Sequence, residues 1–499
     1  MSAFPSSAIG LPQSLQYNLP PSLPDSCRSY SVNVAPDGIT SVTGPAISSI
    51  FTASGTNGGV TAFGNFTSQM ISFTLPSGMS KSVFLDPAST TVSFSMNYTI
   101  STASASTTTP VFKLIGSGSS WFDSMVTYSN NVPLETVNSY GQLANFMLQN
   151  TSNMADRYGG ISIAMGTDTN SANGIDLAHA ATGTYKYNFC IPLLSILGAN
   201  SDKFFPIGSV NNIQIQLQTA NLLPLVAWQA ASAPTAGQIS AGITLNEFTL
   251  NMKYIDVGDM AGALLAQTLQ DGKWFIKSQT YTNSSVNIPS GSQGTQQLLL
   301  QIRNTSVKSI FHQFSTAQSG NSPNGYYDAV NPTLTSRQCQ VGGNFYPNKP
   351  LNDTQRPAEA YPYFIQSLST GGGITKALGN MVNRYMYNSI GAVASFSVSG
   401  ADSTCVLPAA GVRALPAGSD SDTTAQTYVA NFPNSAYYGY DLEKSAGILF
   451  QGVNTRASPP FLNLFLNTST NATLLCNAWG LSDVILEIDT LSQQVKAYI

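Results

Sequence analysis

The sequence predicts an all-β protein built from two similar antiparallel sandwiches, and three observations lead to this prediction. Apolar and polar side chains alternate in many short runs, such as residues 92–100 (VSFSMNYTI) and 248–254 (FTLNMKY). Clusters of Gly, Pro, Asn and Ser separate these runs, which is the pattern of sandwiches and barrels. Helical patterns are few and short, and the two halves of the chain resemble each other.

The chain carries few ionic groups for its length of 499 residues. Lys plus Arg number 20, Asp plus Glu number 24, and charged residues make up 9% of the chain, against a typical share of about 25%. Hydrophobic residues make up 42%, which is enough for a packed core and excludes a disordered chain. Soluble proteins normally rely on a mixed charged surface, so we expect copies of the chain or other proteins to cover much of this one.

The charge distribution also argues against direct binding to nucleic acid. The formal net charge is −4, and Arg28 is the only basic residue among the first 80. A protein that wraps a genome neutralises phosphates with clustered Lys and Arg side chains. We therefore expect no direct nucleic-acid binding.

Residues 212–218 (NIQIQLQ) alternate aliphatic and amide side chains without a break. In a strand the aliphatic residues share one face, which is buried, and the three Gln residues share the other. Two interpretations of the Gln face stay open. It packs against a neighbouring subunit, since an amide both donates and accepts hydrogen bonds and costs less to bury than an ion; or it is an ordinary solvated sheet face.

An internal repeat supports the two-sandwich prediction. The tetrapeptide at 75–78 (LPSG) recurs at 288–291 (IPSG). The strands that follow it stay in step, as three pairs of positions show: Leu85 with Leu298, Phe94 with Val307, and Tyr98 with Phe311.

The two halves also end alike. Strands at 248–256 and 484–489 close them, and each has a late strand after a loop that contains proline, at 212–218 and 461–467. The repeat divides the chain into four parts: an extended N-terminal arm (1–26), a first sandwich (27–257), a helical linker (258–272) and a second sandwich (273–499). The arm holds many prolines and almost no charge, so we expect it to act as a strap, that is, to become ordered along a neighbouring subunit. The alternative is a flexible leader.

Helices and long loops are assigned from periodicity and length. Helical patterns occupy 258–269, 135–148 and 371–384. Four segments exceed the turns that a sandwich needs, and we expect them to leave it as irregular loops: 151–184, 228–242, 315–362 and 401–436. No stretch reaches the roughly 18 consecutive apolar residues of a membrane helix, and the start of the chain does not read as a secretory signal.

Chemistry-bearing residues are sparse and scattered. His179 and His312 are the only histidines, and the pair Asp420 and Asp422 lacks the later acidic ligands of a calcium loop. The five cysteines form no CxxC pair: Cys27, Cys190, Cys339, Cys405 and Cys476. No phosphate-binding, zinc-protease or nucleophile-elbow motif is present. We therefore expect no catalytic, cofactor-binding or metal-binding site, and no enzyme.

The order of the motifs carries a resemblance to a known family. The first half reads WFDSMVTYSNN (121–131), with Pro133, Leu134, Glu135 and Tyr140 next, then FCIPLL (189–194), FFPIG (204–208) and the NIQIQLQ strand; the second half contains QVGGNFYPNKPL (340–351) and EAY (359–361). The chain resembles the double jelly-roll major capsid proteins of eukaryotic DNA viruses, the group that includes large algal viruses, virophages and polinton-like viruses.

This resemblance implies two consecutive eight-stranded antiparallel jelly rolls, with short helices in the loops and the linker. It implies homotrimers that form pseudo-hexameric capsomers and tile an icosahedral virion shell. The implied partners are further copies of the chain, penton and minor capsid proteins, and an internal membrane on the inner face. The alternative is an extracellular β-sandwich that binds or hydrolyses carbohydrate, in which Trp121, Trp228, Trp274 and Trp479 would stack on sugars.

Overall fold

The structure is a computed structural model that describes residues 27–499 with gaps, the longest being 101–110, 152–163, 165–173, 230–241, 317–328 and 369–435. Several sequence predictions therefore lie outside the described residues: the arm at 1–26, the helical pattern at 371–384, nearly all of the loop at 401–436, His179, Cys405, and the pair Asp420 and Asp422.

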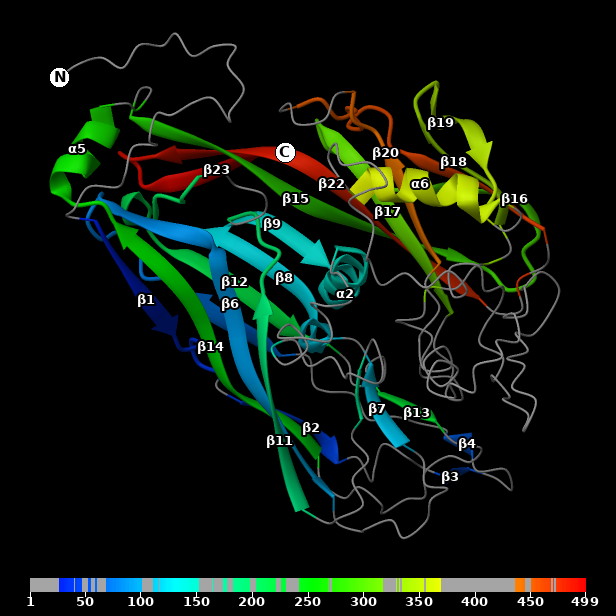
Figure 1. The fold of residues 1–499 in the computed structure, drawn as a ribbon, viewed down its shortest axis with the longest axis horizontal. Coiled ribbons are helices and arrows are strands. Elements are labelled where there is room, and N and C mark those ends of the chain that lie inside the picture. The colour runs from blue at the N-terminus through cyan, green and yellow to red at the C-terminus, as the bar shows by residue number, and fades with distance from the viewer. Residues whose placement is uncertain are drawn as a thin grey trace, which may run out of the picture.

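The first half forms two facing antiparallel sheets (Figure 1). One has a path of four strands and a fifth strand off this path, β2 (Ser41–Ala46), and the other has four strands. One sheet contains, in spatial order, β1 (Arg28–Val34), β14 (Gly242–Asp256), β6 (Val83–Ile100) and β11 (Gly183–Pro192). The other contains β5 (Met70–Thr74), β12 (Ile213–Thr219), β8 (Phe122–Ser129) and β9 (Val132–Asn138). We call the sheet that contains β1 the first outer sheet and the sheet that contains β5 the first inner sheet.

The second half repeats this arrangement strand for strand. Its outer sheet contains β15 (Lys273–Ile288), β22 (Leu474–Asp489), β17 (Val307–Thr316) and β20 (Tyr437–Asp441). Its inner sheet contains β16 (Gly294–Leu299), β21 (Phe461–Leu466), β18 (Leu334–Val341) and β19 (Asn344–Leu351). In each half the first, last, third and sixth strands pair in one sheet and the second, seventh, fourth and fifth in the other. This is the order of a jelly roll, so the predicted double jelly roll is confirmed.

Smaller elements surround the two jelly rolls. The additional strands are β2 (Ser41–Ala46), β3 (Ala53–Ser54), β4 (Gly59–Val60), β7 (Val111–Ile115), β10 (Gly174–Asp176), β13 (Val226–Gln229) and β23 (Gln494–Tyr498). The helices are η2 (Gly118–Trp121), α2 (Tyr140–Thr151), η3 (Ile207–Ser209), α5 (Asp259–Gln267) and α6 (Pro357–Leu368). Helix α5 lies between the jelly rolls in the chain, where a helical linker is predicted. No helix in the described part of the chain is long and apolar enough to cross a bilayer.

The structure corrects one part of the internal repeat. Residues 75–78 follow β5, the second strand of their jelly roll. Residues 288–291 begin with the last residue of β15, the first strand of the other jelly roll, and continue into the turn after it. The two tetrapeptides are therefore not equivalent, although Gly78 (φ 67°) and Gly291 (φ 81°) both adopt the left-handed conformation. A Pro-Ser-Gly sequence indicates a turn that needs such a glycine and says little about which turn it is. The closing strands β14 and β22, and the late strands β12 and β21, are equivalent as predicted.

Three further sequence predictions are wrong. Residues 135–148 are not one helix, because β9 runs to Asn138 and α2 begins at Tyr140. The preceding Asn130 and Asn131 both have positive φ and form the tight turn of a β8–β9 hairpin, which extends the strand pattern past Glu135.

The segment 315–362 is not an irregular loop, because it contains β18, β19 and the start of α6. Pro347 and Pro350 conceal the alternation of β19, which lies at the sheet edge where proline is tolerated. Residues 151–184 likewise include β10 and the start of β11.

Candidate assembly surface

The amide row of residues 212–218 lies on the face of the first inner sheet that points away from the core. The aliphatic side chains of β12 are fully buried and the glutamines are half-buried. Gln214 donates a hydrogen bond from Nε2 to Thr74 Oγ1 at 3.2 Å, and Gln218 accepts one from Ser124 Oγ at 2.9 Å. Both partners lie on neighbouring strands, so the amides tie their own sheet together.

The second inner sheet uses amides in the same way. Asn463 in β21 donates from Nδ2 to Gln340 Oε1 in β18 at 3.0 Å. Gln338 donates from Nε2 to the carbonyl oxygens of Pro347 at 2.9 Å and Asn348 at 3.0 Å, which lie in β19. Cross-strand bonding is thus sufficient to explain the amides, and it favours the interpretation that they form an ordinary sheet face.

A buried carboxylate joins the two jelly rolls. Glu135 Oε1 accepts hydrogen bonds from Thr127 Oγ1 (2.8 Å), Ser195 Oγ (3.0 Å) and the Ile196 amide (2.6 Å), while Oε2 accepts one from Thr280 Oγ1 (3.2 Å). The first three donors belong to the first jelly roll, and Thr280 lies in β15 of the second. Burial raises the pKa of Glu135, and the hydrogen bonds act in the opposite direction.

An aromatic cluster extends this junction. Phe146 of α2 lies with its ring centroid 5.0 Å from Tyr437, 5.7 Å from Phe311, 5.8 Å from Trp479 and 6.0 Å from Phe364. All four partners belong to the second jelly roll, and α2 lies between the two halves in Figure 1. One continuous apolar cluster therefore spans both halves and fixes them relative to each other.

His312 lies inside the second jelly roll and is unsuited to catalysis. Its ring stacks 4.9 Å from Tyr438 and 5.6 Å from Tyr440, and its Nε2 lies 3.3 Å from Tyr440 Oη. Burial, reinforced by the nearby Arg337 guanidinium, holds the pKa of His312 well below its usual value. Arg337 is itself fully buried and pairs with Asp353 through Nε and Nη2. These charges are satisfied internally and form part of the core.

A second buried ionic group lies at Lys308. Its Nζ is 2.7 Å from Glu443 Oε1 and 3.7 Å from Asp483 Oδ1. Burial lowers the pKa of Lys308 and raises the pKa of Asp441 to about 6. Among the residues that the structure describes, no group of three or more His, Cys, Asp or Glu side chains is arranged to hold a metal ion.

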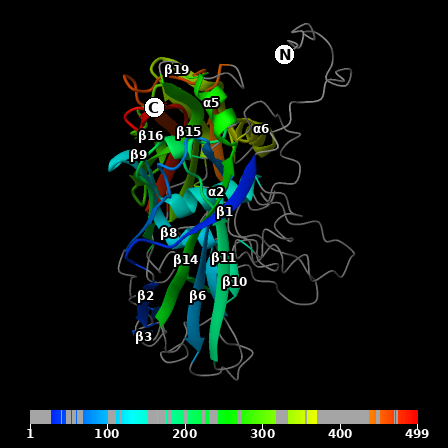
Figure 2. The ribbon, with the colours of Figure 1, turned by 90° about the vertical axis from the view of Figure 1, so that its left-hand side faces the viewer.

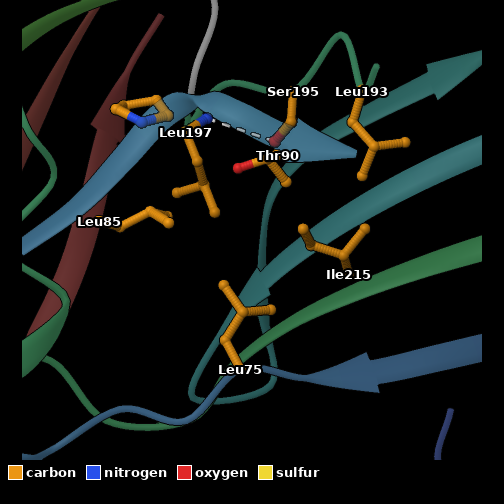
Figure 3. Close-up of a pocket in the computed structure, with 8 residues that line it drawn as sticks. Leu75, Leu85, Thr90, Leu193, Ser195, Leu197 and Ile215 are labelled. Atoms are coloured by element: carbon orange, nitrogen blue, oxygen red, sulfur yellow. Dashed lines mark hydrogen bonds between the residues drawn. The ribbon is translucent and has the colours of Figure 1, made fainter. Parts of the chain in front are cut away.

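A small cavity lies inside the first jelly roll (Figure 3). Leu75, Leu85, Leu193, Leu197 and Ile215 supply most of its lining, together with Pro87, Thr90 and Ser195, and its volume is about 10 Å³. The Ser195 hydroxyl accepts a hydrogen bond from the Leu197 amide at 3.3 Å, as Figure 3 shows. A space of this size accommodates at most about one water molecule, so it is no ligand pocket.

The three tryptophans whose side chains the structure describes offer no platform for sugar stacking. Trp121 and Trp479 are fully buried in the core, and the half-buried Trp274 packs edge-on against Phe84 at 6.0 Å. The side chain of Trp228 lies outside the described residues. The described tryptophans therefore give no support to the carbohydrate-binding alternative.

The cysteines of the described part, Cys27, Cys190, Cys339 and Cys476, are all free. Cys339 and Cys476 are buried, and burial raises the pKa of both thiols, which makes them unreactive core residues.

Comparison with known proteins gives likenesses at the level of structure. No protein-family model and no curated protein sequence matches the chain. The capsid of the virus PBCV-1 superposes with a TM-score of 0.51 at 10% identity, covering 97% of each chain. PBCV-1 VP54, as fitted into a reconstruction of the virophage Sputnik, gives 0.53 at 10% identity and covers 97% of this chain and 99% of its own.

The major capsid protein of mavirus gives a TM-score of 0.50 at 10% identity, covering 100% of this chain and 95% of its own. At such identities the likeness concerns the fold, and it extends over both jelly rolls and their connection. The chain therefore has the double jelly-roll fold of these viral major capsid proteins.

Proposed function

We propose that the chain is a major capsid protein whose homotrimers form pseudo-hexameric capsomers that tile an icosahedral virion shell. The observation that carries this proposal is the pairing of two jelly rolls of identical strand order across a buried junction. Each chain supplies two similar blocks at a fixed spacing. Three chains in closed cyclic symmetry then give six blocks, which is the shape that tiles a surface hexagonally.

The proposal includes the partners and the location of the chain. Copies of the chain form the trimer, neighbouring trimers form the shell, and penton and minor capsid proteins complete it. The chain is assembled inside the host cell and located in the virion, and an internal membrane or other proteins separate it from the genome. The low charge of the chain, with a net charge of −4, supports the absence of direct contact with nucleic acid.

The proposal also retains the division of the chain into an arm (1–26), jelly rolls at 27–257 and 273–499, and a linker (258–272). The strand ranges support it, since the last strand of the first jelly roll ends at Asp256 and the first strand of the second begins at Lys273. The role of the chain is structural, and the described residues supply no candidate for catalysis.

The test is the mass and shape of the purified protein. Native mass spectrometry should give three times 52.7 kDa, and negative stain should show hexagonal blocks with three-fold symmetry. A monomer that binds a glycan array would contradict the proposal and favour the carbohydrate-binding alternative.

A further inference from the structure

The outward faces of the two outer sheets differ in chemistry. On the second outer sheet, strand alternation points Phe311, Tyr437 and Trp479 away from the core of their own jelly roll. These three aromatic residues are buried all the same, because Phe146 of α2 in the first jelly roll contacts all three, while Phe364 of α6 in the second stacks on Tyr437. Within one chain, the first jelly roll thus covers the outward face of the second outer sheet.

The equivalent face of the first outer sheet has small uncharged polar side chains in place of the aromatics. We call this the Ser/Thr/Asn face. Its members alternate with core residues along four strands: Ser31 and Asn33 in β1, Thr249 and Asn251 in β14, Thr91 and Ser93 in β6, and Asn188 in β11. Asn251 Nδ2 donates to Ser93 Oγ at 2.6 Å, so a cross-strand hydrogen bond joins two members of the face. Figure 2 shows β14, β6 and β11 side by side on this side of the molecule.

Charged groups border the Ser/Thr/Asn face and are absent from its centre. At one end Lys186 Nζ pairs with Glu247 Oε1 at 2.7 Å. At the other end Lys253 and Asp86 are register partners on β14 and β6. Interfaces between proteins show this arrangement, with charge depleted at the core and kept at the rim. Ser, Thr and Asn are also soluble before assembly and cost less to bury than ions once their hydrogen bonds are satisfied.

We infer that the Ser/Thr/Asn face is the surface on which the second jelly roll of a neighbouring copy of this chain packs within the trimer. This inference rests on the proposed capsomer and deepens it. Six jelly rolls in a closed ring have alternating junctions, within a chain and between chains. The within-chain junction puts the first jelly roll on the outer sheet of the second. Head-to-tail closure therefore puts the second jelly roll on the first outer sheet of the next chain.

The matching surface of the neighbour follows from the same equivalence. In the first jelly roll, the parts that reach across the junction are the β8–β9 turn, β9 and α2. Their equivalents in chain order are the β18–β19 turn, β19 and α6. These expose large apolar side chains that the single chain does not cover, with Phe345 40% and Tyr363 39% exposed. We assign them to the contact with the Ser/Thr/Asn face of the neighbour.

The test compares two isosteric substitutions that each turn an amide into a carboxylate. Asn251→Asp places a charge at the centre of the Ser/Thr/Asn face, and Gln216→Glu places one on the inner sheet of the same jelly roll. Circular dichroism and melting temperature establish that each variant folds. At concentrations where the wild type is trimeric, N251D should be largely monomeric, with a trimer dissociation constant raised at least about tenfold, whereas Q216E should remain trimeric.

A second readout needs no substitution. Cys190 lies on β11 beside Asn188, and strand alternation places it on the same face, with Ser93 as its register partner. In the wild-type trimer the Cys190 thiol should resist alkylation, read by peptide mass spectrometry, and dilution to monomer or the N251D substitution should expose it. Rapid Cys190 alkylation in the intact trimer would overturn the inference, as would N251D and Q216E behaving alike. Either result leaves the capsomer proposal standing, whereas a wild type that never trimerises overturns both.

Discussion

Thr280 of the second jelly roll donates a hydrogen bond to the Glu135 carboxylate of the first at 3.2 Å, across a sequence separation of 145 residues. Glu135 has no basic partner among its hydrogen-bonding neighbours, and three further donors surround it. The junction between the jelly rolls therefore contains an acceptor that four donors require. Other buried polar contacts also cross this junction, since Asn477 Nδ2 donates to Gln142 Oε1 and the Ser278 hydroxyl donates to the Ile196 carbonyl.

Removing this acceptor should destabilise the protein, and replacing it with an amide should not. Glu135→Ala leaves buried donors unsatisfied, so we expect a loss of about 3 kcal/mol in the free energy of unfolding. Glu135→Gln keeps one oxygen that can accept the three hydrogen bonds now made to Oε1, and its NH₂ group can donate to the Thr280 hydroxyl. The free energy of unfolding should therefore change by no more than about 1 kcal/mol. Denaturant unfolding measures both. Equal losses for the two variants would contradict this account.

Truncating Phe146 should loosen the jelly rolls from each other. Phe146→Ala removes the ring that contacts four aromatic residues of the second half, with an expected cost of about 4 kcal/mol. We expect cleavage within the linker at 258–272 to become faster in limited proteolysis. Phe275→Ala is the matched control, since Phe275 is 52% exposed and its loss should change stability by less than about 0.5 kcal/mol.

Breaking the buried pair of Arg337 and Asp353 should cost more than replacing both partners. Asp353→Ala leaves a buried guanidinium beside the Gly439 carbonyl and the rings of Tyr438 and Tyr440, none of which replaces the lost negative charge. We expect a loss of about 4 kcal/mol. The double variant Arg337→Met with Asp353→Leu should recover part of that loss. A double variant as unstable as Asp353→Ala would show that the pair itself stabilises the fold.

Asp441 should make the free energy of unfolding depend on pH in the mildly acidic range. Burial raises its pKa from an ordinary value of 3.8 to about 6, while a hydrogen bond from Gln366 and the charge of Lys308 oppose the shift. The folded protein therefore holds this proton more tightly than the unfolded chain does. The resulting stabilisation is complete below about pH 3.8 and lost as the pH rises to about 6. Asp441→Asn should flatten the melting temperature across this window, and an unchanged slope would count against the assignment.

Strand alternation predicted most of the fold because sheets with one buried face impose a period of two on the sequence. The NIQIQLQ strand and the two closing strands are examples, and each lies where its pattern places it. The alternation of β19 is interrupted by Pro347 and Pro350, which an edge strand tolerates, so the pattern was missed there. The Pro-Ser-Gly turns were misaligned because many jelly-roll turns need a left-handed glycine.

The contacts at the junction between the jelly rolls could not be predicted from the sequence, for a different reason. The alternation of β9 does not distinguish Glu135 from a surface carboxylate, since its partners are Ser195, Ile196 and Thr280, far away in the chain. The sequence pattern of the Ser/Thr/Asn face is also the same as that of a solvated sheet. Its difference from the equivalent aromatic face of the second jelly roll is visible only in the structure.

The position of Phe146 also constrains the order in which the chain can mature. Its partners Phe311, Tyr437 and Trp479 are translated long after α2, and Trp479 follows Phe146 by 333 residues. The first jelly roll therefore emerges from the ribosome while helix α2 still lacks its native cover. Phe146 stays uncovered by these partners until β22, which contains Trp479, has been translated. Products that stop before β22 consequently retain an exposed aromatic surface, and only chains that include this strand become competent building blocks.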